Sequence, residues 1–440
     1  MAVAERAIGS LLTPAKLRVW GWLSAISLVD QGLTAGAGFG VNLLLARWMT
    51  PEVYGAFAVA FAGFLFVSGF HNVLLLEPMC VLGPSRYAER LPAYFRAQIY
   101  VHLALVGPLS VVALLASVIL ERVVPGSPLV GAVLGAGIVL PFLLLAWLAR
   151  RMCYVVQRPA LAVLGSGFYV TFVAAGLFVL GHYGWLGAFT VFLLMGCGSF
   201  LAAGLLVWRL GLLKRTPNEE PGVSWRAALG ENWTYGRWLV GSAVLGALVF
   251  QTQTFLAAAV LGLGAAGILR AMQLPMLAMG HSIVAAGILV LPSFSYDFGR
   301  GQTERLRHKT VLVSAGLGSV ALCFAAILAL FSGPIEHLLY GGKYASYAGL
   351  IPLLALIAAC QGFSIGYAMA MRAWQKTRFD LVANAIAAPV AVISALLFMR
   401  WWGLAGAAAS MVAGFGAYTI SVCWIYYGSR ETKWRWSFVK

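Results

Sequence analysis

The sequence predicts an all-α integral membrane protein with about 12 transmembrane helices, arranged as two six-helix bundles related by a parallel pseudo-two-fold repeat. The first observation is composition: the 440 residues are 61% hydrophobic and 10% charged, with a mean hydropathy of +0.88. Soluble domains carry about 25% charged residues. The second is that the apolar runs have the roughly 20-residue length that a helix needs to cross a bilayer. The third is a weak internal recurrence, described below.

The apolar runs divide into twelve expected spans, six in each half of the chain. The predicted spans are 22–47, 53–77, 95–119, 129–152, 160–181, 185–209, 237–261, 266–291, 311–332, 348–371, 381–400 and 404–427.

Lys and Arg residues set the expected orientation. With the N-terminus inside, 25 of the 30 basic residues lie in or beside inner segments and five lie on the outer side. Because basic residues favour cytoplasmic loops, both termini are expected in the cytoplasm. The same rule accounts for the net charge of +16 without a nucleic-acid partner. The five outer residues are Arg47, Arg122, Arg270, Lys343 and Arg400.

A long polar segment divides the chain into two halves. We expect an N-terminal lobe over 1–209, a cytoplasmic linker over 210–236, a C-terminal lobe over 237–428 and a cytoplasmic tail over 429–440. Short strings recur at offsets of 211 to 219 residues, for example GWLGA at 184–188 and GLAGA at 403–407. An even number of helices in each half makes the repeats parallel.

The first span carries two stripes, each with a spacing of four residues, on roughly opposite faces. Small residues at this spacing favour close helix packing, and a polar face suits a helix that lines a cavity. A carboxylate within a span marks either a transport pathway or a structural pair with a hydroxyl or amide on another span. The polar stripe is Asp30, Thr34, Gly38 and Asn42, and the glycine stripe is Gly32, Gly36 and Gly40.

The second span adds His71, Asn72 and Glu77. His71 and Asn72 lie deep enough to need partners, whereas Glu77 either reaches the headgroups or joins them. Glu77 lies toward the cytoplasmic end of its span. Because Asp30 lies about a third of the way across the membrane from the cytoplasmic side, we expect His71 or Glu77 to approach it. Asp30 and Glu77 are the candidate proton- or cation-coupling groups.

The seventh and eighth spans hold most of the remaining polarity within the membrane. In the eighth span, Arg270, Gln273 and His281 share one helical face, with Pro275 among them as a potential kink. A cationic stripe of this kind suits a phosphate, although Arg270 can also snorkel to the outer surface. In the seventh span the amides of Gln251 and Gln253 can bind sugar hydroxyls or pair across helices.

Several classes of function lack their sequence signals. The phosphate-binding pattern G-x-x-x-x-G-K-[ST] does not occur, so ATP-driven transport within this chain is not indicated. The six cysteines form no C-x-x-C pair, and we expect neither a disulfide framework, nor a metal site, nor a cofactor. No extramembrane segment presents paired carboxylates or a Ser/His/Asp set, so an enzyme is not expected.

Three stretches carry a pattern beyond composition. The first, DQGLTAGAGFGVNLLLARWMTPEVYGAFAVA, has an LLLAR-type helix end, a short outer turn and then Y-G. The second is LLLEP followed by the basic segment RYAERLPAYFR, and the third is GPIEHLLYGGKY at 333–344. Together they resemble bacterial polysaccharide flippases of the multidrug/oligosaccharidyl-lipid/polysaccharide exporter superfamily. The two extra C-terminal helices typical of lipid II flippases have no counterpart here.

The resemblance implies alternating access and a polyprenyl diphosphate bearing an oligosaccharide as the substrate, flipped across the bacterial inner membrane for exopolysaccharide or lipopolysaccharide biosynthesis. It implies contacts with membrane lipid and with a polymerase or glycosyltransferases of the same pathway. The diphosphate would lie at Arg270 and His281, and sugar would lie at Asn42, Gln251 and Gln253. The remaining candidates for the cavity lining are Gln273, His71 and Asn72.

Two other functions remain open at this point. A cation-coupled multidrug exporter of the same superfamily would need a deep acidic site, which Asp30 could supply. A membrane enzyme such as a glycan polymerase or ligase would need a catalytic outer loop, and the 334–347 loop offers only Glu336, His337 and Lys343.

Overall fold

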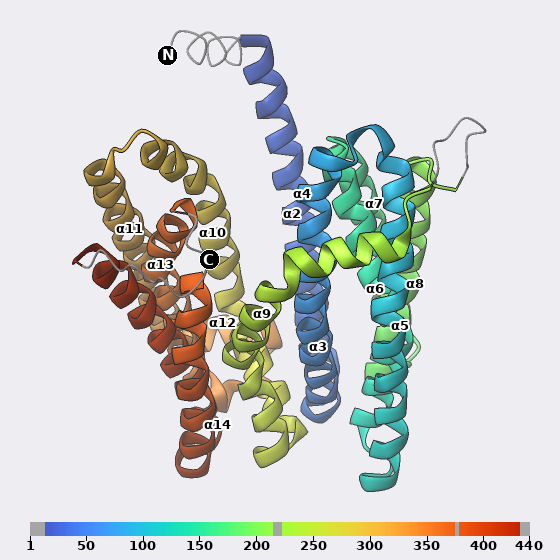
Figure 1. The fold of residues 1–440 in the computed structure, drawn as a ribbon. Helices are drawn as coiled ribbons and strands as arrows, with labels where there is room; N and C mark the ends of the chain where they lie inside the picture. Colours follow the sequence, from blue (N-terminus) through green and yellow to red (C-terminus); the bar gives the residue numbers. More distant parts are fainter. Residues whose placement is uncertain (1–13, 214–221, 375–377, 432–440) are drawn as a thin grey trace, which may run out of the picture. The chain divides into compact units, whose positions relative to one another are not determined.

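The computed structural model describes residues 14–213, 222–374 and 378–431, and every regular element in these ranges is a helix (Figure 1). The elements of the first half are α2 (Pro14–Trp48), α3 (Pro51–His71), a π-helix (Asn72–Leu76), α4 (Glu77–Arg86), α5 (Leu91–Val123), α6 (Pro128–Val155), α7 (Pro159–His182) and α8 (Ala188–Arg209). Those of the second half are α9 (Trp225–Leu261), α10 (Leu263–Gly299), α11 (Thr303–Leu330), α12 (Ser332–Tyr340), α13 (Leu350–Ala373) and α14 (Arg378–Glu431).

These helices match the predicted spans one by one. Within the described residues, 10 helical stretches are long and apolar enough to cross a membrane, and the stretch 51–86 counts as one of them. Helix α2 covers the first predicted span. Helix α14 contains two spans, because Gly403 breaks its helical geometry with φ 55° and ψ −127°. Only glycine adopts such a conformation at little cost, so residues 378–402 and 404–431 are separate helices joined by a one-residue turn.

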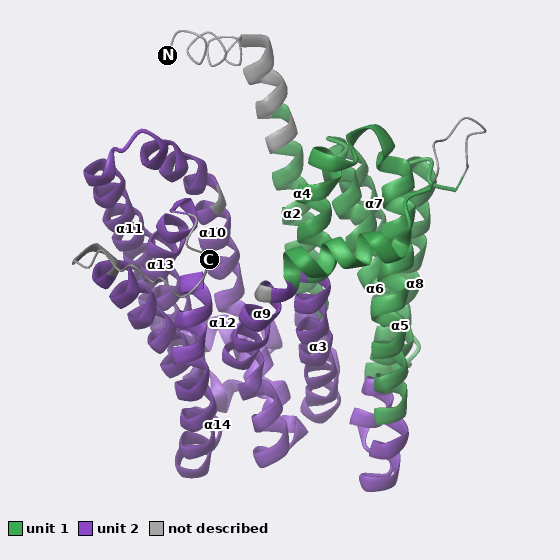
Figure 2. Cartoon of the chain, in the orientation of Figure 1, with its two compact units in different colours: residues 1–41, 74–116, 134–236 green, residues 42–73, 117–133, 237–440 purple. Residues whose placement is uncertain are grey.

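The chain forms two compact units (Figure 2). Unit 1 comprises residues 1–41, 74–116 and 134–236, and unit 2 comprises 42–73, 117–133 and 237–440. In unit 1, Leu75, Phe95 and Met152 share a buried core cluster, and Tyr94 of that cluster stacks on Tyr87 with ring centroids 4.3 Å apart.

Unit 2 contains glycine-mediated helix crossings. A Cβ built on Gly362 would lie 2.7 Å from the Leu317 carbonyl oxygen, so α13 and α11 meet backbone to backbone. Helices α3 and α10 meet in the same way, because a Cβ on Gly55 would overlap the Leu263 carbonyl oxygen and one on Gly267 that of Pro51. Such crossings make close helix packing possible where no side chain fits between the backbones.

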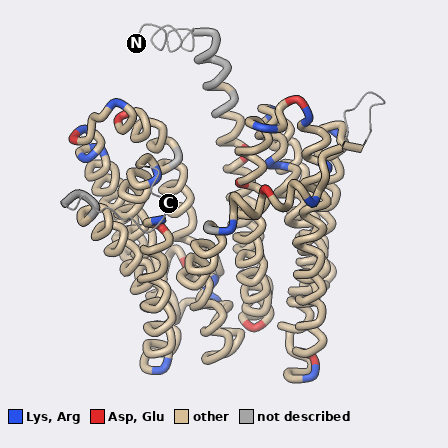
Figure 3. Tube along the Cα trace, in the orientation of Figure 1, with Lys and Arg blue, Asp and Glu red and all other residues tan. Residues whose placement is uncertain are grey.

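Two segments that lie largely outside the predicted membrane spans are helical. Residues 225–236, within the expected linker, form the first turns of α9 and belong to unit 1. There the buried side chains of Gln98 and Asn232 exchange two hydrogen bonds of 3.3 and 2.9 Å. Residues 332–340, within the expected outer loop, form α12. Figure 3 shows that Lys and Arg gather near the helix ends, as the hydropathy pattern predicts.

Candidate functional site

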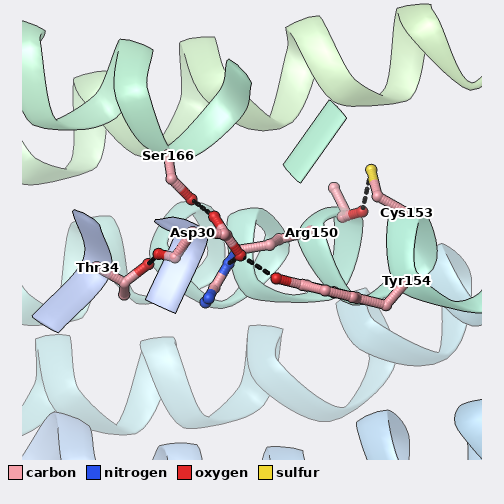
Figure 4. A network of polar contacts seen from close by, with 7 residues as sticks. Asp30, Thr34, Arg150, Cys153, Tyr154 and Ser166 are labelled. Atoms are coloured by element: carbon pink, nitrogen blue, oxygen red, sulfur yellow. Dashed lines mark hydrogen bonds and ion pairs between the residues drawn. The ribbon is translucent and has the colours of Figure 1, made fainter. Parts of the chain in front are cut away.

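The polar centre of unit 1 is the carboxylate of Asp30, which is fully buried (Figure 4). The Arg150 guanidinium donates its Nε–H to Asp30 Oδ2 over 2.7 Å, and Tyr154 donates its hydroxyl to the same oxygen. Ser166 donates to Oδ1 over 2.5 Å. A buried carboxylate is tolerated when a cation and hydrogen bonds compensate it, and both oxygens of Asp30 are satisfied in this way.

Two neighbouring helices supply these partners. Arg150 and Tyr154 lie four residues apart and therefore on one face of α6, and Ser166 lies on α7. The Arg150 side chain is 25% exposed, whereas that of Asp30 has no exposure. The guanidinium is thus partly exposed at the surface of unit 1, while the carboxylate is enclosed.

The prediction for the glycine stripe of α2 was wrong. A Cβ built at Gly32, Gly36 or Gly40 has no atom within 4 Å among the described residues, so no neighbouring helix packs closely there. Of the polar stripe in unit 1, Asp30 is buried and bonds to α6 and α7, whereas Thr34 and Gly38 are exposed. The hydrogen bonds of Asp30, and not small-residue packing, therefore hold this part of α2 in unit 1.

Unit 2 contains a second carboxylate with similar partners. Asp380 on α14 accepts a hydrogen bond of 3.1 Å from Ser242 and one of 2.8 Å from Tyr418. Ser242 lies 212 positions after Asp30, and Asp380 lies 214 positions after Ser166. Both spacings fall within the offsets of the internal recurrence. The two halves thus carry equivalent Asp–Ser hydrogen bonds in which the donor and acceptor positions are exchanged.

Arg270 on α10 lies in a polar cluster of unit 2 with two other predicted site residues, Asn42 and Gln273. Its Nε donates to Asn42 Oδ1 over 3.4 Å, and its Nη1 donates to Gln273 Oε1 over 3.3 Å. Tyr54 also donates to Asn42 Oδ1, over 3.2 Å. Arg270 forms no ion pair with a carboxylate in the described part of the chain. Its guanidinium therefore donates to two side-chain amide oxygens and is not neutralised by a carboxylate.

The other predicted residues of spans 7 and 8 are not brought into this cluster by any hydrogen bond. Gln253 is fully buried, and neither of its amide atoms has a hydrogen-bond partner among the described residues. Gln251 is half-buried, and His281 is exposed on α10. An orphaned buried amide costs roughly 1–3 kcal/mol, so Gln253 is a strong candidate for a group that meets a ligand or water.

His71 and Asn72 lie at a structural irregularity. His71 is buried and ends α3, and Asn72 begins the π-helix that continues to Leu76, directly before Glu77. Short π-helices within α-helices occur frequently at functional sites. The boundary between the two compact units, at 73/74, falls within this π-helix.

Sequence reasoning missed Arg150, Tyr154, Ser166 and Asp380. The charge pattern places Arg150 among the inner-side basic residues, and the two hydroxyl residues are of types common in apolar helices. The internal offset was the one available signal, because applying it to Asp30 leads to Ser242.

The chain is an all-α, multi-pass membrane protein with a twelve-helix, two-bundle fold. No family model and no curated protein sequence matches it.

Solved structures share the fold. A multidrug resistance MATE family transporter of the MOP superfamily, in an inward-facing conformation, matches with a TM-score of 0.77 and 12% identity over 92% of this chain and 99% of its own. The lipid II flippase MurJ, in an inward closed conformation, matches with a TM-score of 0.67 and 13% identity over 92% of this chain and 87% of its own. The MATE multidrug transporter DinF-BH, in complex with R6G, matches with a TM-score of 0.64 and 16% identity over 95% and 96%.

Proposed function

We propose that the protein is a transporter that flips a polyprenyl-diphosphate-linked oligosaccharide across the bacterial inner membrane by alternating access. The fold is that of MATE transporters and of a lipid II flippase, and is therefore compatible with both a drug and a lipid-linked substrate. Fold alone does not choose between them. The choice rests on the charges within the two units.

The observation that carries the proposal is that Arg270 has no carboxylate partner while Asp30 has a cation. A cationic drug is best bound by an unneutralised carboxylate in a site of low dielectric. Here Arg150 neutralises Asp30 at 2.7 Å, and Asp380 accepts hydrogen bonds from Ser242 and Tyr418. Arg270 is a cation without a carboxylate partner among the described residues of its cluster. A guanidinium in that state favours an anion, and a diphosphate fits its bidentate donor geometry.

The polar residues then take the following roles in the proposal. Arg270 and His281 bind the diphosphate, and Asn42, Gln251 and Gln253 contact sugar hydroxyls. Gln273, His71 and Asn72 line the path between them. Asp30 and Glu77 remain the candidate coupling groups. The lobes at 1–209 and 237–428, the linker 210–236, the cytoplasmic termini and the pathway enzymes as partners belong to the same proposal.

Flipping is tested with the purified protein in proteoliposomes that contain a fluorescent polyprenyl-diphosphate oligosaccharide. The wild-type protein should move the label to the opposite leaflet, and Arg270→Gln should slow it. Arg122→Gln, which removes an outer arginine that has no described ion pair, is the matched control. In cells, deletion should abolish surface polysaccharide and leave lipid-linked repeat units on the inner leaflet.

The alternative is a cation-coupled multidrug exporter, which the bound R6G in DinF-BH keeps under consideration. In that case deletion would leave the surface polymer normal and increase sensitivity to cationic drugs. Flipping in proteoliposomes would then be absent while drug efflux was present.

A further inference from the structure

The short connector between α11 and α13, residues 332–347, binds the end of a helix from the first half of the chain. Lys343 donates from Nζ to the carbonyl oxygens of Ala46 over 2.9 Å and of Arg47 over 3.5 Å, and also to that of Met49. The Tyr344 hydroxyl donates to the Ala46 oxygen over 2.9 Å. All of these residues belong to unit 2.

These carbonyls lie at the C-terminal end of α2, which ends at Trp48. The last carbonyls of a helix have no partners within the helix, and that end carries a partial negative charge. An ammonium group satisfies both needs at once. Lys343 therefore acts as a C-terminal cap of α2, although it lies 297 residues after Ala46 in the sequence.

The rest of the connector holds Lys343 in position beside the end of α2. Gly341 and Gly342 have φ of 69° and 84°, the left-handed conformation that turns the chain directly after α12. The buried carboxylate of Glu336 accepts the Tyr344 backbone N–H over 2.8 Å and closes the turn. The Tyr340 hydroxyl donates to the Ala271 carbonyl on α10 over 2.6 Å and fixes α12 to that helix.

The N-terminal ends of α3 and α10 also contact each other, at the Gly55–Gly267 crossing. The connector thus ties the end of α2, and with it the start of α3, to α10. By the charge rule these ends lie on the outer side of the membrane. A transporter that releases its substrate outward must separate the first-half spans from the second half at this end.

We propose that the connector 332–347 is a latch that keeps the outer side of the transport path closed, and that Lys343 and Tyr344 are its releasable contacts. Burial lowers the pKa of the Lys343 ammonium, with the Glu52 carboxylate acting in the opposite direction. The ammonium therefore loses hydration when it binds the carbonyls, which keeps the latch reversible. The need to open rests on the proposed function, whereas the contact itself does not.

Hydrogen–deuterium exchange of the full-length protein in lipid nanodiscs tests the latch. Lys343→Met should raise exchange by roughly tenfold over 43–60 of α2 and α3 and over 263–271 of α10, because charge-assisted hydrogen bonds to the helix end are lost. Tyr344→Phe should give a smaller rise in the same segments. Arg122→Met, which removes an outer charge outside the latch, should leave exchange unchanged.

Two outcomes would overturn the proposal. One is unchanged exchange in both latch variants. The other is a rise confined to 43–50, which would mean that Lys343 only caps α2. If Lys343→Met does not fold, Tyr344→Phe still decides, because it removes a single hydroxyl. Absence of flipping by the wild-type protein would refute the proposed function and leave the exchange result intact.

Discussion

The carboxylate of Asp30 and the guanidinium of Arg150 lie 2.7 Å apart, although 120 residues separate them in the sequence. The two groups differ in surroundings, since the carboxylate has no exposure and the Arg150 side chain is 25% exposed. Removing either partner therefore has unequal consequences, and this asymmetry can be measured.

Replacing Arg150 by Met should destabilise the protein more than replacing Asp30 by Asn. Arg150→Met leaves a buried, uncompensated carboxylate, which costs about 3–5 kcal/mol. Asp30→Asn keeps hydrogen-bonding atoms for Ser166 and Tyr154, and the freed arginine can turn to solvent. Thermal unfolding in detergent measures the difference, and the double variant should recover part of the loss. Equal single effects that simply add would contradict the pairing.

Asp30→Asn should also impair transport without loss of membrane insertion. This result is expected if Asp30 couples transport to a proton or cation, or lines the transport path. The proteoliposome flipping assay and the amount of protein in the membrane fraction report the two effects separately. Full transport by this variant would remove Asp30 from the candidate coupling groups.

Arg270→Gln should slow flipping by roughly 10- to 100-fold, the factor expected for a lost hydrogen bond to a charged group. Because Arg270 has no carboxylate partner among the described residues, this change leaves no anion stranded and should barely alter stability. Inhibition of flipping by free pyrophosphate should weaken in parallel. A normal flipping rate together with normal inhibition by pyrophosphate would refute the diphosphate site.

Gln253→Leu should keep or raise thermal stability, because it replaces a buried amide that has no hydrogen-bond partner among the described residues with an apolar group of similar size. If the amide meets sugar during the cycle, the same variant should lose transport. Stability and flipping are measured on one preparation. Lower stability with unchanged flipping would mean that Gln253 is only structural.

Gly55→Ala should open the crossing of α3 and α10, because its Cβ would overlap the Leu263 carbonyl oxygen. The matched control is Gly63→Ala on the same helix, where the added Cβ has no atom within 4 Å among the described residues. A helical Gly→Ala change without a clash stabilises by roughly 0.5–1 kcal/mol. The midpoint temperature of thermal unfolding should therefore fall for Gly55→Ala and be maintained or rise for Gly63→Ala. Equal midpoints for the two variants would argue against the close crossing.

The helices were predictable because a bilayer demands long apolar runs, and each of the twelve predicted runs lies in a described helix. The turn at Gly403 lies between the predicted spans 381–400 and 404–427, but its one-residue geometry is a finding of the structure.

The partners of the buried groups could not be predicted in the same way. Periodicity places Asp30 on a face of α2 but does not indicate which distant helix supplies its cation. The glycine stripe failed for a related reason, because small residues favour close packing only where a second helix is present. The apolar pattern over 53–77 does not indicate the π-helix at 72–76, and the position of Lys343 in an outer loop does not indicate its contact with the end of α2.

The ion pair of Asp30 also has a consequence for biosynthesis. Ribosomes add about 5–20 residues per second, so roughly 6 to 24 seconds pass between the synthesis of Asp30 and that of Arg150. During that interval the first span must enter or wait beside the bilayer with an acid that lacks its cation. Nascent chains that stop before residue 150 should therefore integrate their first helix less completely than chains that extend beyond Ser166.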